Sequence, residues 1–131
     1  MLKDQKFQTV LNAKGADGIG TPMYIGDHQH VILEIWFAAA TLTIKFQGSV
    51  SESVPDFSAA QALDNLWDYI EVVDLEDGTA IDGDTGISSS GAASDARIVE
   101  LNTNGMRWLN LIVSSRSAGS VTVKARSFNN Q

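Results

Sequence analysis

The feature that most constrains this chain is a set of short segments in which apolar and polar residues alternate one by one. The clearest is TLTIKFQGS at 41–49, where Leu42, Ile44 and Phe46 take every second position. A period of two residues places successive side chains on opposite faces of a β-strand. The same alternation recurs in three further segments, at 31–37, 109–113 and 121–125. The chain is therefore predicted to form strands that each bury one apolar face.

Turn signals between these segments define the fold class. Gly, Asp, Asn and Pro cluster between the alternating runs, and no long run shows the 3.6-residue period of a helix. About seven or eight short strands are expected, which favours an all-β, antiparallel, jelly-roll-like β-sandwich. The 131 residues are expected to form one domain, residues 1–131, because no linker or repeat interrupts them. Two readings stay open for 57–65, a short helix and an irregular loop.

Two local predictions concern the second half of the chain. Asn104-Gly105 lies between two β-type segments, and this dipeptide accepts the positive φ angles of a tight turn, so a hairpin is predicted there. The Ser, Gly and Ala residues at 88–94 have the composition of a mobile loop.

Composition and charge exclude several classes of function. The chain has no cysteine, which excludes disulfides and thiolate metal sites. Its net charge of −7 disfavours nucleic acid as a partner, because binding phosphates needs clustered Lys and Arg. No apolar run approaches the length of a membrane span, and the amino-terminal residues lack an apolar signal core, so neither membrane insertion nor signal-directed export is expected.

The charges are unevenly placed along the chain. Between Glu52 and Asp84 there are ten acidic residues and no basic one, whereas from Arg97 onward there are five basic residues and one acidic. In one interpretation these charges pair or are solvated within the same fold. In the other, an acidic face of one subunit meets a basic face of its neighbour.

The search for chemistry yields no catalytic group and no cofactor. Serines are plentiful, but no motif places a base beside one, so enzymatic activity is not expected. His28 and His30 have a spacing that can hold a metal, yet no third ligand is evident. Asp82 and Asp84 lie in a glycine-rich segment that loosely resembles the start of a calcium loop, and they are weak calcium candidates without its later ligands.

Three residues are candidates for a protein interface. Trp36 and Trp108 fall on the less apolar side of their segments, where a large ring suits a second buried surface rather than the core. Arg107 shares the parity of the core leucines, so its charge needs a partner, and the central acidic segment is the expected one.

The order of these elements carries a resemblance to a known group of proteins. The segments are LTIKFQGSVS, NLWDYIEVVDLEDG, IDGDTGI and VELNTNGMRWLNLIVSSRSAGSVTVKARSFNN, which together fall within about residues 30–130. In this order they resemble small β-sandwich virion structural proteins of tailed bacteriophages. The pattern is structural, so it transfers no functional residue.

The resemblance implies a non-enzymatic virion protein that is assembled in the host cytoplasm. Its first implied role is capsid decoration, cement or head accessory, with contacts to the major capsid protein and to itself, and a trimer is the expected assembly. A tail or baseplate component is the alternative role. A carbohydrate-binding module for the host surface is the competing class, since tryptophans can serve as stacking platforms for sugars.

Overall fold

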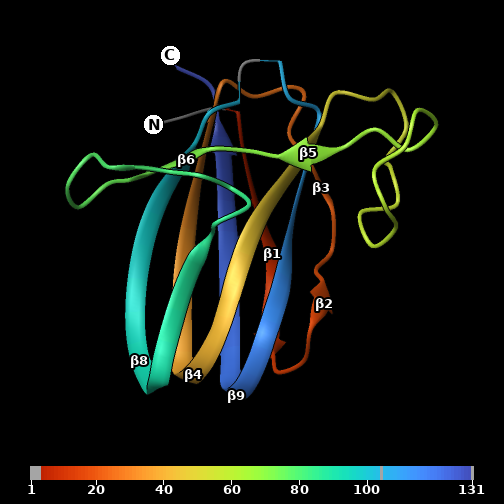
Figure 1. Ribbon diagram of the computed structural model, residues 1–131. Helices are drawn as coiled ribbons and strands as arrows, with labels where there is room; N and C mark the ends of the chain where they lie inside the picture. The colour runs from red at the N-terminus through yellow and green to blue at the C-terminus, as the bar shows by residue number, and fades with distance from the viewer. Residues whose placement is uncertain (1–3, 104, 131) are drawn as a thin grey trace.

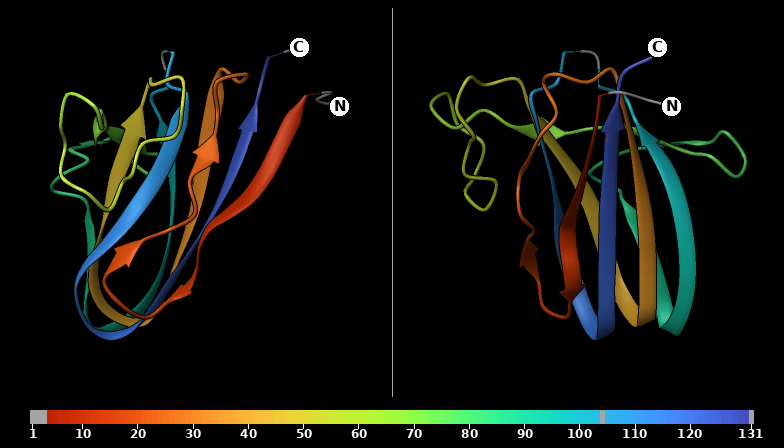
Figure 2. Two further views of the ribbon diagram at one scale, coloured as in Figure 1. Left: turned by 90° about the vertical axis from the view of Figure 1, so that its right-hand side faces the viewer. Right: turned by 180° about the vertical axis from the view of Figure 1, so that it is seen from behind.

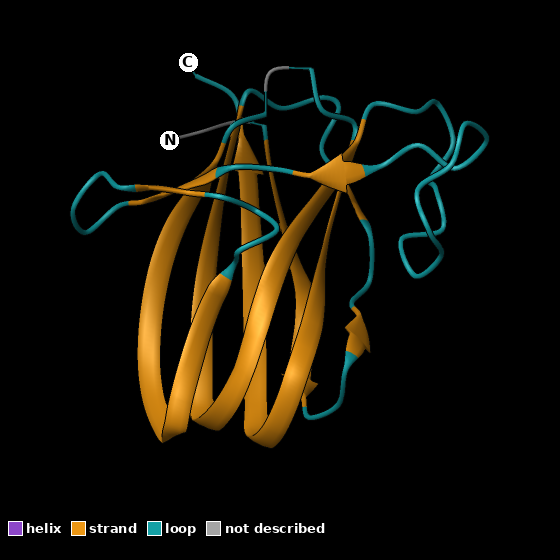
Figure 3. Cartoon of the chain, in the orientation of Figure 1, coloured by secondary structure: helices purple, strands orange, loops and turns teal. Residues whose placement is uncertain are grey.

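The computed structural model describes residues 4–103 and 105–130, and all of their regular structure is β. Nine strands form one antiparallel sheet with the principal order β1-β9-β4-β8-β6-β7, while β2 and β3 pair with β9 and β5 pairs with β4. The predicted all-β, antiparallel class is confirmed. No helix occurs in the described part of the chain, as Figure 3 shows, and none of it could span a membrane as a helix.

Three long strands make up most of the sheet. They are β4 (His30–Ser49), β8 (Ile87–Leu101) and β9 (Trp108–Phe128), and β1 (Gln5–Lys14) extends the sheet beside β9. The remaining strands are short: β2 (Gly18–Ile19), β3 (Met23–Tyr24), β5 (Asp68–Tyr69), β6 (Val72–Asp74) and β7 (Ala80–Ile81).

Each long strand turns a corner at the lower end of the molecule and runs back, so one curled sheet makes two facing layers (Figure 1). At the corners the register shifts, and Ala39, Ala92 and Ser115 take positive φ angles of 45°, 52° and 54°. Bulges of this kind bend a strand sharply. The front layer holds the second half of β4 with the first halves of β8 and β9, and the rear layer holds their other halves and β1.

The corner of β4 keeps its apolar side chains on the inside. Phe37 and Ala40 are both buried although they lie three residues apart, because the irregularity at Ala39 shifts the alternation by one residue. The predicted inward faces of both layers are confirmed. The core between the layers includes these fully buried side chains: Leu33, Ile35, Phe37, Leu42, Ile44, Phe46, Leu109, Leu111, Val113, Val121 and Val123.

The segment 57–65 is irregular, so the helix alternative is wrong. The carboxylate of Asp56 accepts the N–H of Ser58 at 2.9 Å, and the Asn65 side chain both accepts the N–H of Asp56 at 2.8 Å and donates to its carbonyl at 2.9 Å. Asp, Ser and Asn side chains that bond the backbone in this way compete with a helix. Phe57 is buried, and its carbonyl accepts from Gln47 at 3.0 Å, so the loop is anchored to the core.

Two other local predictions are also wrong. The run 88–94 belongs to β8, and its serines and glycine lie at the strand's corner. The hairpin expected at Asn104-Gly105 is not formed, because β8 pairs with β4 and β6 whereas β9 pairs with β4 on its other side. Asn104 itself lies outside the described residues. The end of β8 and the start of β9 therefore lie in different layers, on opposite sides of β4 in the order of the sheet.

Candidate interaction surface

The outward side of the rear layer is the most exposed apolar part of the sheet. Seen from behind, β1, β9, β4 and β8 lie side by side, and no loop of the described chain crosses them (Figure 2, right). We call this surface the rear face and define it by Phe7, Ile32, Glu34, Trp36, Ile98, Glu100, Lys124 and Arg126. Phe7 is 69% exposed, Ile98 50% and Trp36 49%. Three large apolar side chains on one uncovered sheet are typical of a protein interaction site.

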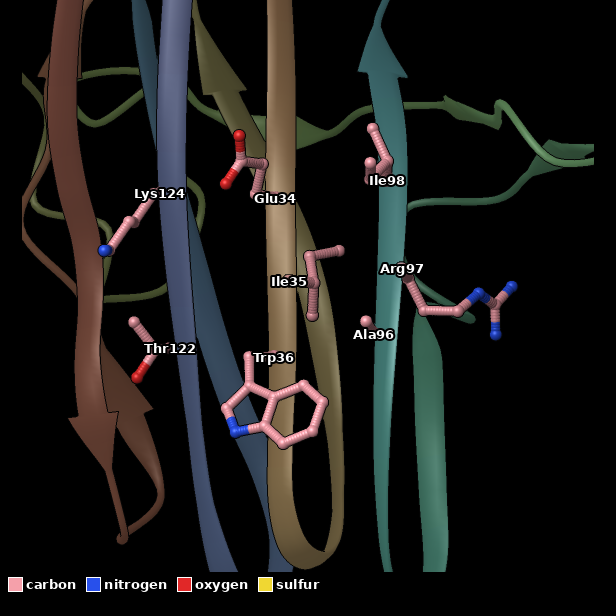
Figure 4. A pocket seen from close by; sticks show the side chains of 8 residues that line it. All are labelled: Glu34, Ile35, Trp36, Ala96, Arg97, Ile98, Thr122 and Lys124. Atoms are coloured by element: carbon pink, nitrogen blue, oxygen red, sulfur yellow. The ribbon is translucent and has the colours of Figure 1, made fainter.

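Trp36 lies over a shallow groove of about 410 Å³ in this face (Figure 4). Its cross-strand partners are Thr122 on β9 and Ala96 on β8, whose small side chains leave the indole ring uncovered. A second hollow of about 350 Å³ adjoins it and shares Glu34, Ile98 and Lys124. The two hollows make one continuous shallow surface, which suits a broad contact rather than an enclosed ligand.

The charges of the rear face are balanced and largely unpaired within the molecule. Glu34 on β4 lies directly across from Lys124 on β9, yet neither takes part in a salt bridge of the described residues. Arg126 donates to the Gln5 side chain at 3.1 Å and lies 4.3 Å from the centre of the Phe128 ring. Glu100 completes the set at the edge, across from Ile32. Two cations and two carboxylates therefore share this face.

Arg97 lines the groove but its charge is directed away from it. Its guanidinium forms a salt bridge with the buried carboxylate of Asp74 in β6, beyond the edge of β8. The N–H of Glu76 donates to the same carboxylate at 2.9 Å. These two contacts, the backbone donor first and Arg97 second, lower the pKa of Asp74 below its usual value. The pair ties the β6–β7 hairpin to the edge of the rear layer.

This ion pair predicts a loss of stability in acid. Because the pKa of Asp74 is lower in the folded state, its stabilisation is complete above the unfolded pKa of about 4 and is lost as the pH falls through the folded pKa. We expect the melting temperature to decrease as the pH drops below about 4. Asp74→Asn should lower the melting temperature at pH 7 and make it depend less on pH. Melting curves of both proteins between neutral and acidic pH test this. If the melting temperatures of the parent and of Asp74→Asn change with pH in the same way, the prediction is contradicted.

The second tryptophan and its neighbouring arginine lie within the fold's own packing. Trp108 is half-buried, meets Tyr24 edge-on at 5.1 Å between ring centres, and donates its indole N–H to the carbonyl of Ser51 at 3.1 Å. The guanidinium of Arg107 lies 5.4 Å from the centre of the Tyr24 ring. Arg107 forms no salt bridge with any described acidic residue, so the expected partner in the central acidic segment is wrong. An interface at these two residues stays a prediction.

The metal candidates are engaged in local contacts. Asp82 accepts the N–H groups of Asp84 and Thr85 at 2.7 and 3.2 Å, and Asp84 forms a salt bridge with Lys45 at 3.0 Å. His28 bonds Ser127 at 2.7 Å, whereas His30 stacks on Phe128. Within the described residues no three His, Asp or Glu side chains gather where they could hold a metal ion. The calcium hypothesis for Asp82 and Asp84 therefore gains no support.

Two solved structures of prophage proteins share this fold. The SPBc2 prophage-derived protein YomS superposes with a TM-score of 0.64 and 18% identity, covering 95% of this chain and 92% of YomS. The PBSX exported protein XepA superposes with a TM-score of 0.69 and 13% identity, covering 95% of this chain but 37% of XepA. No protein-family model matches the sequence, and no curated protein matches it either.

These two structures support the resemblance to phage proteins at the level of fold. Both carry names of prophage origin, and the β-rich fold that the resemblance implies is confirmed. The chain spans nearly all of YomS but only about a third of XepA. At these identities the likeness is one of fold, so the role of the chain rests on its own surface.

Sequence reasoning found only part of this surface. The alternation at 31–37 placed Trp36 on the outer side, and that placement is correct. It missed Phe7 and Ile98, although both are exposed, because their neighbours on the face come from strands that are distant in sequence. Ile98 alternates with buried Val99 in the run ARIVEL, which is the signal that could have identified it.

Proposed function

We propose that this protein is a non-enzymatic structural component of a phage particle and that the rear face is its contact surface. The observation that carries the proposal is the uncovered sheet face with Trp36, Ile98 and Phe7 among unpaired charges. Burying these side chains against another protein is favourable. The fold that the chain shares with two prophage proteins supports a phage association.

Among phage roles, capsid decoration, cement or head accessory is the first choice. A broad, shallow face on a rigid two-layer sheet suits lateral contacts with the major capsid protein and with further copies of the chain. A tail or baseplate component uses the same kind of contact and is the alternative. Both roles require assembly by shape and surface chemistry rather than by catalysis.

Analysis of purified particles tests this function. Particles of the phage that encodes the chain are banded in a density gradient, their heads and tails are separated, and their proteins are quantified by mass spectrometry. We expect the chain in the particle fraction in many copies, and in the head fraction if it decorates the capsid. Its presence in the lysate but not in banded particles would contradict the proposal.

A carbohydrate-binding role is the second candidate, and the exposed indole of Trp36 favours it. A half-exposed ring beside Thr122 and Glu34 offers a stacking platform with hydrogen-bonding groups next to it. This role predicts binding on a glycan array that is abolished by Trp36→Ala. An array without hits leaves the assembly proposal as the only one.

A further inference from the structure

We infer that the rear face binds a second copy of this chain about a two-fold axis that runs along the strands, between β4 and β9. The inference deepens the proposed function, on which it rests, by naming the partner of that face. It follows from the register of the two central strands, the balance of charge on the face and the area that the face offers.

The register makes the rear face complementary to itself. Across β4 and β9, Glu34 lies opposite Lys124, and Trp36 lies opposite Thr122. A two-fold axis between these strands, in the plane of contact, exchanges them. It therefore sets Glu34 of each copy against Lys124 of the other, which forms two intermolecular ion pairs from groups that have no salt bridge within the described molecule.

The same axis gives Trp36 and Ile32 small or aliphatic partners in the second copy. Each Trp36 ring meets the small Thr122 of the second copy, and each Ile32 meets the aliphatic stem of Arg126, its cross-strand partner in the register. Glu34 and Lys124 lie beside these apolar contacts along the strands, so the ion pairs are partly shielded from water. Opposed sheets pack about 10 Å apart, which leaves room for interleaved side chains of this size.

The charge balance disfavours the alternative of an acidic loop docking on this face. The acidic segment between Glu52 and Asp84 has no basic residue, and the rear face carries Glu34 and Glu100 beside its two cations. An approaching acidic loop would meet these carboxylates. A face with equal numbers of both signs is matched better by a copy of itself.

The area of the face places the contact in a size class. Four strands about 4.8 Å apart and about seven residues long cover on the order of 440 Å² in projection. Two copies thus bury on the order of 1,000 Å², which is the low end for a specific interface. We therefore expect a weak, reversible dimer. A two-fold contact closes as a dimer, in place of the trimer expected from the sequence.

Charge reversal with mixing tests the axis directly. In Glu34→Lys the substituted lysine of each copy faces Lys124 of the other, and in Lys124→Glu the substituted glutamate faces Glu34 of the other. Each variant alone should associate at least about ten-fold more weakly than the parent protein. In an equimolar mixture of the two variants every facing pair joins a lysine to a glutamate, so a mixed dimer of parental affinity should form. Sedimentation velocity over a concentration series measures all of these species.

The controls separate assembly from folding. Glu52→Lys makes the same charge change on the loop that follows β4, away from the rear face, and should dimerise like the parent. The double variant Glu34→Lys/Lys124→Glu should dimerise again. Unchanged circular dichroism and similar melting temperatures establish that the variants are folded. A mixture that associates no more than its separate components, or a parent protein that stays monomeric at millimolar concentration, overturns the inference. Incorporation into particles would still test the proposed function separately.

Discussion

Gly119→Ala is expected to destabilise the protein by about 3 kcal/mol, which lowers the melting temperature by about 10 °C for a domain of this size. Gly119 lies at the corner of β9 with φ +66°, and a Cβ atom there would stand 2.2 Å from the Ala39 carbonyl oxygen and 2.3 Å from that of Ala38. A side chain adds left-handed strain of about 1 kcal/mol to this backbone clash. Thermal and urea unfolding measure the loss.

Gly91→Ala is the matched control for this prediction. Gly91 lies at the corner of β8 with φ +65°, but nothing stands within 4 Å of the position its Cβ would take. It should therefore cost only about 1 kcal/mol, the left-handed strain alone. The difference between the variants isolates the close approach of β9 to β4. Equal losses would show that the corners do not pack as tightly as described.

These corners also explain which part of the fold could be predicted from sequence. Alternation at 41–47 and 109–113 assigns side chains to faces, and the assigned inward residues are buried. It does not say whether a break such as Ala38–Ala40 ends one strand or bends it. Here the chain bends, because one residue of positive φ restores the inward parity and the hydrogen bonds to β8 and β9 continue beyond it. Long bent strands therefore arise where separate short ones were expected on each side.

Long-range pairing was beyond the reach of local signals. Asn104-Gly105 has the chemistry of a hairpin turn, yet β4 lies between β8 and β9 in the sheet. The placement of β4 depends on burying its apolar sides in both layers, and no short segment encodes that. Arg107 illustrates the same limit, because charge counting along the chain directed it to the acidic segment, whereas the fold places it over Tyr24.

Only one residue of the rear face, Trp36, could be predicted from the sequence; the surface as a whole could not. Parity alone placed Trp36 outside, as found. The same parity selected Trp108, which packs against Tyr24 because β3 pairs with the start of β9. Whether an outward ring is covered depends on which strand lies beside it. That information is held by the topology rather than by the pattern of one strand.

Trp36→Ser is expected to weaken self-association about 1,000-fold or more, because the symmetric dimer loses two rings, and to leave the fold intact. Trp36 is 49% exposed, so about 120 Å² of a ring of about 250 Å² remains to be buried on contact. At about 25 cal/mol per Å² this area is worth about 2–3 kcal/mol for each ring, the size of an interface hot spot, and thus about 4–6 kcal/mol for the two rings of the dimer. Sedimentation velocity measures the association. The melting temperature of the dilute monomer should fall only in part, because about half of the ring is already exposed to solvent, and circular dichroism should show the parental fold.

Leu63→Ser gives the comparison that decides where the contact lies. Leu63 is 91% exposed on the loop between β4 and β5, away from the rear face, and its loss removes a similarly accessible apolar group. If the rear face is the contact, this variant associates like the parent while Trp36→Ser does not. Normal association of Trp36→Ser together with failure of Leu63→Ser would move the contact to the loop. The exposed tryptophan would then be free to serve as the sugar platform that the glycan array examines.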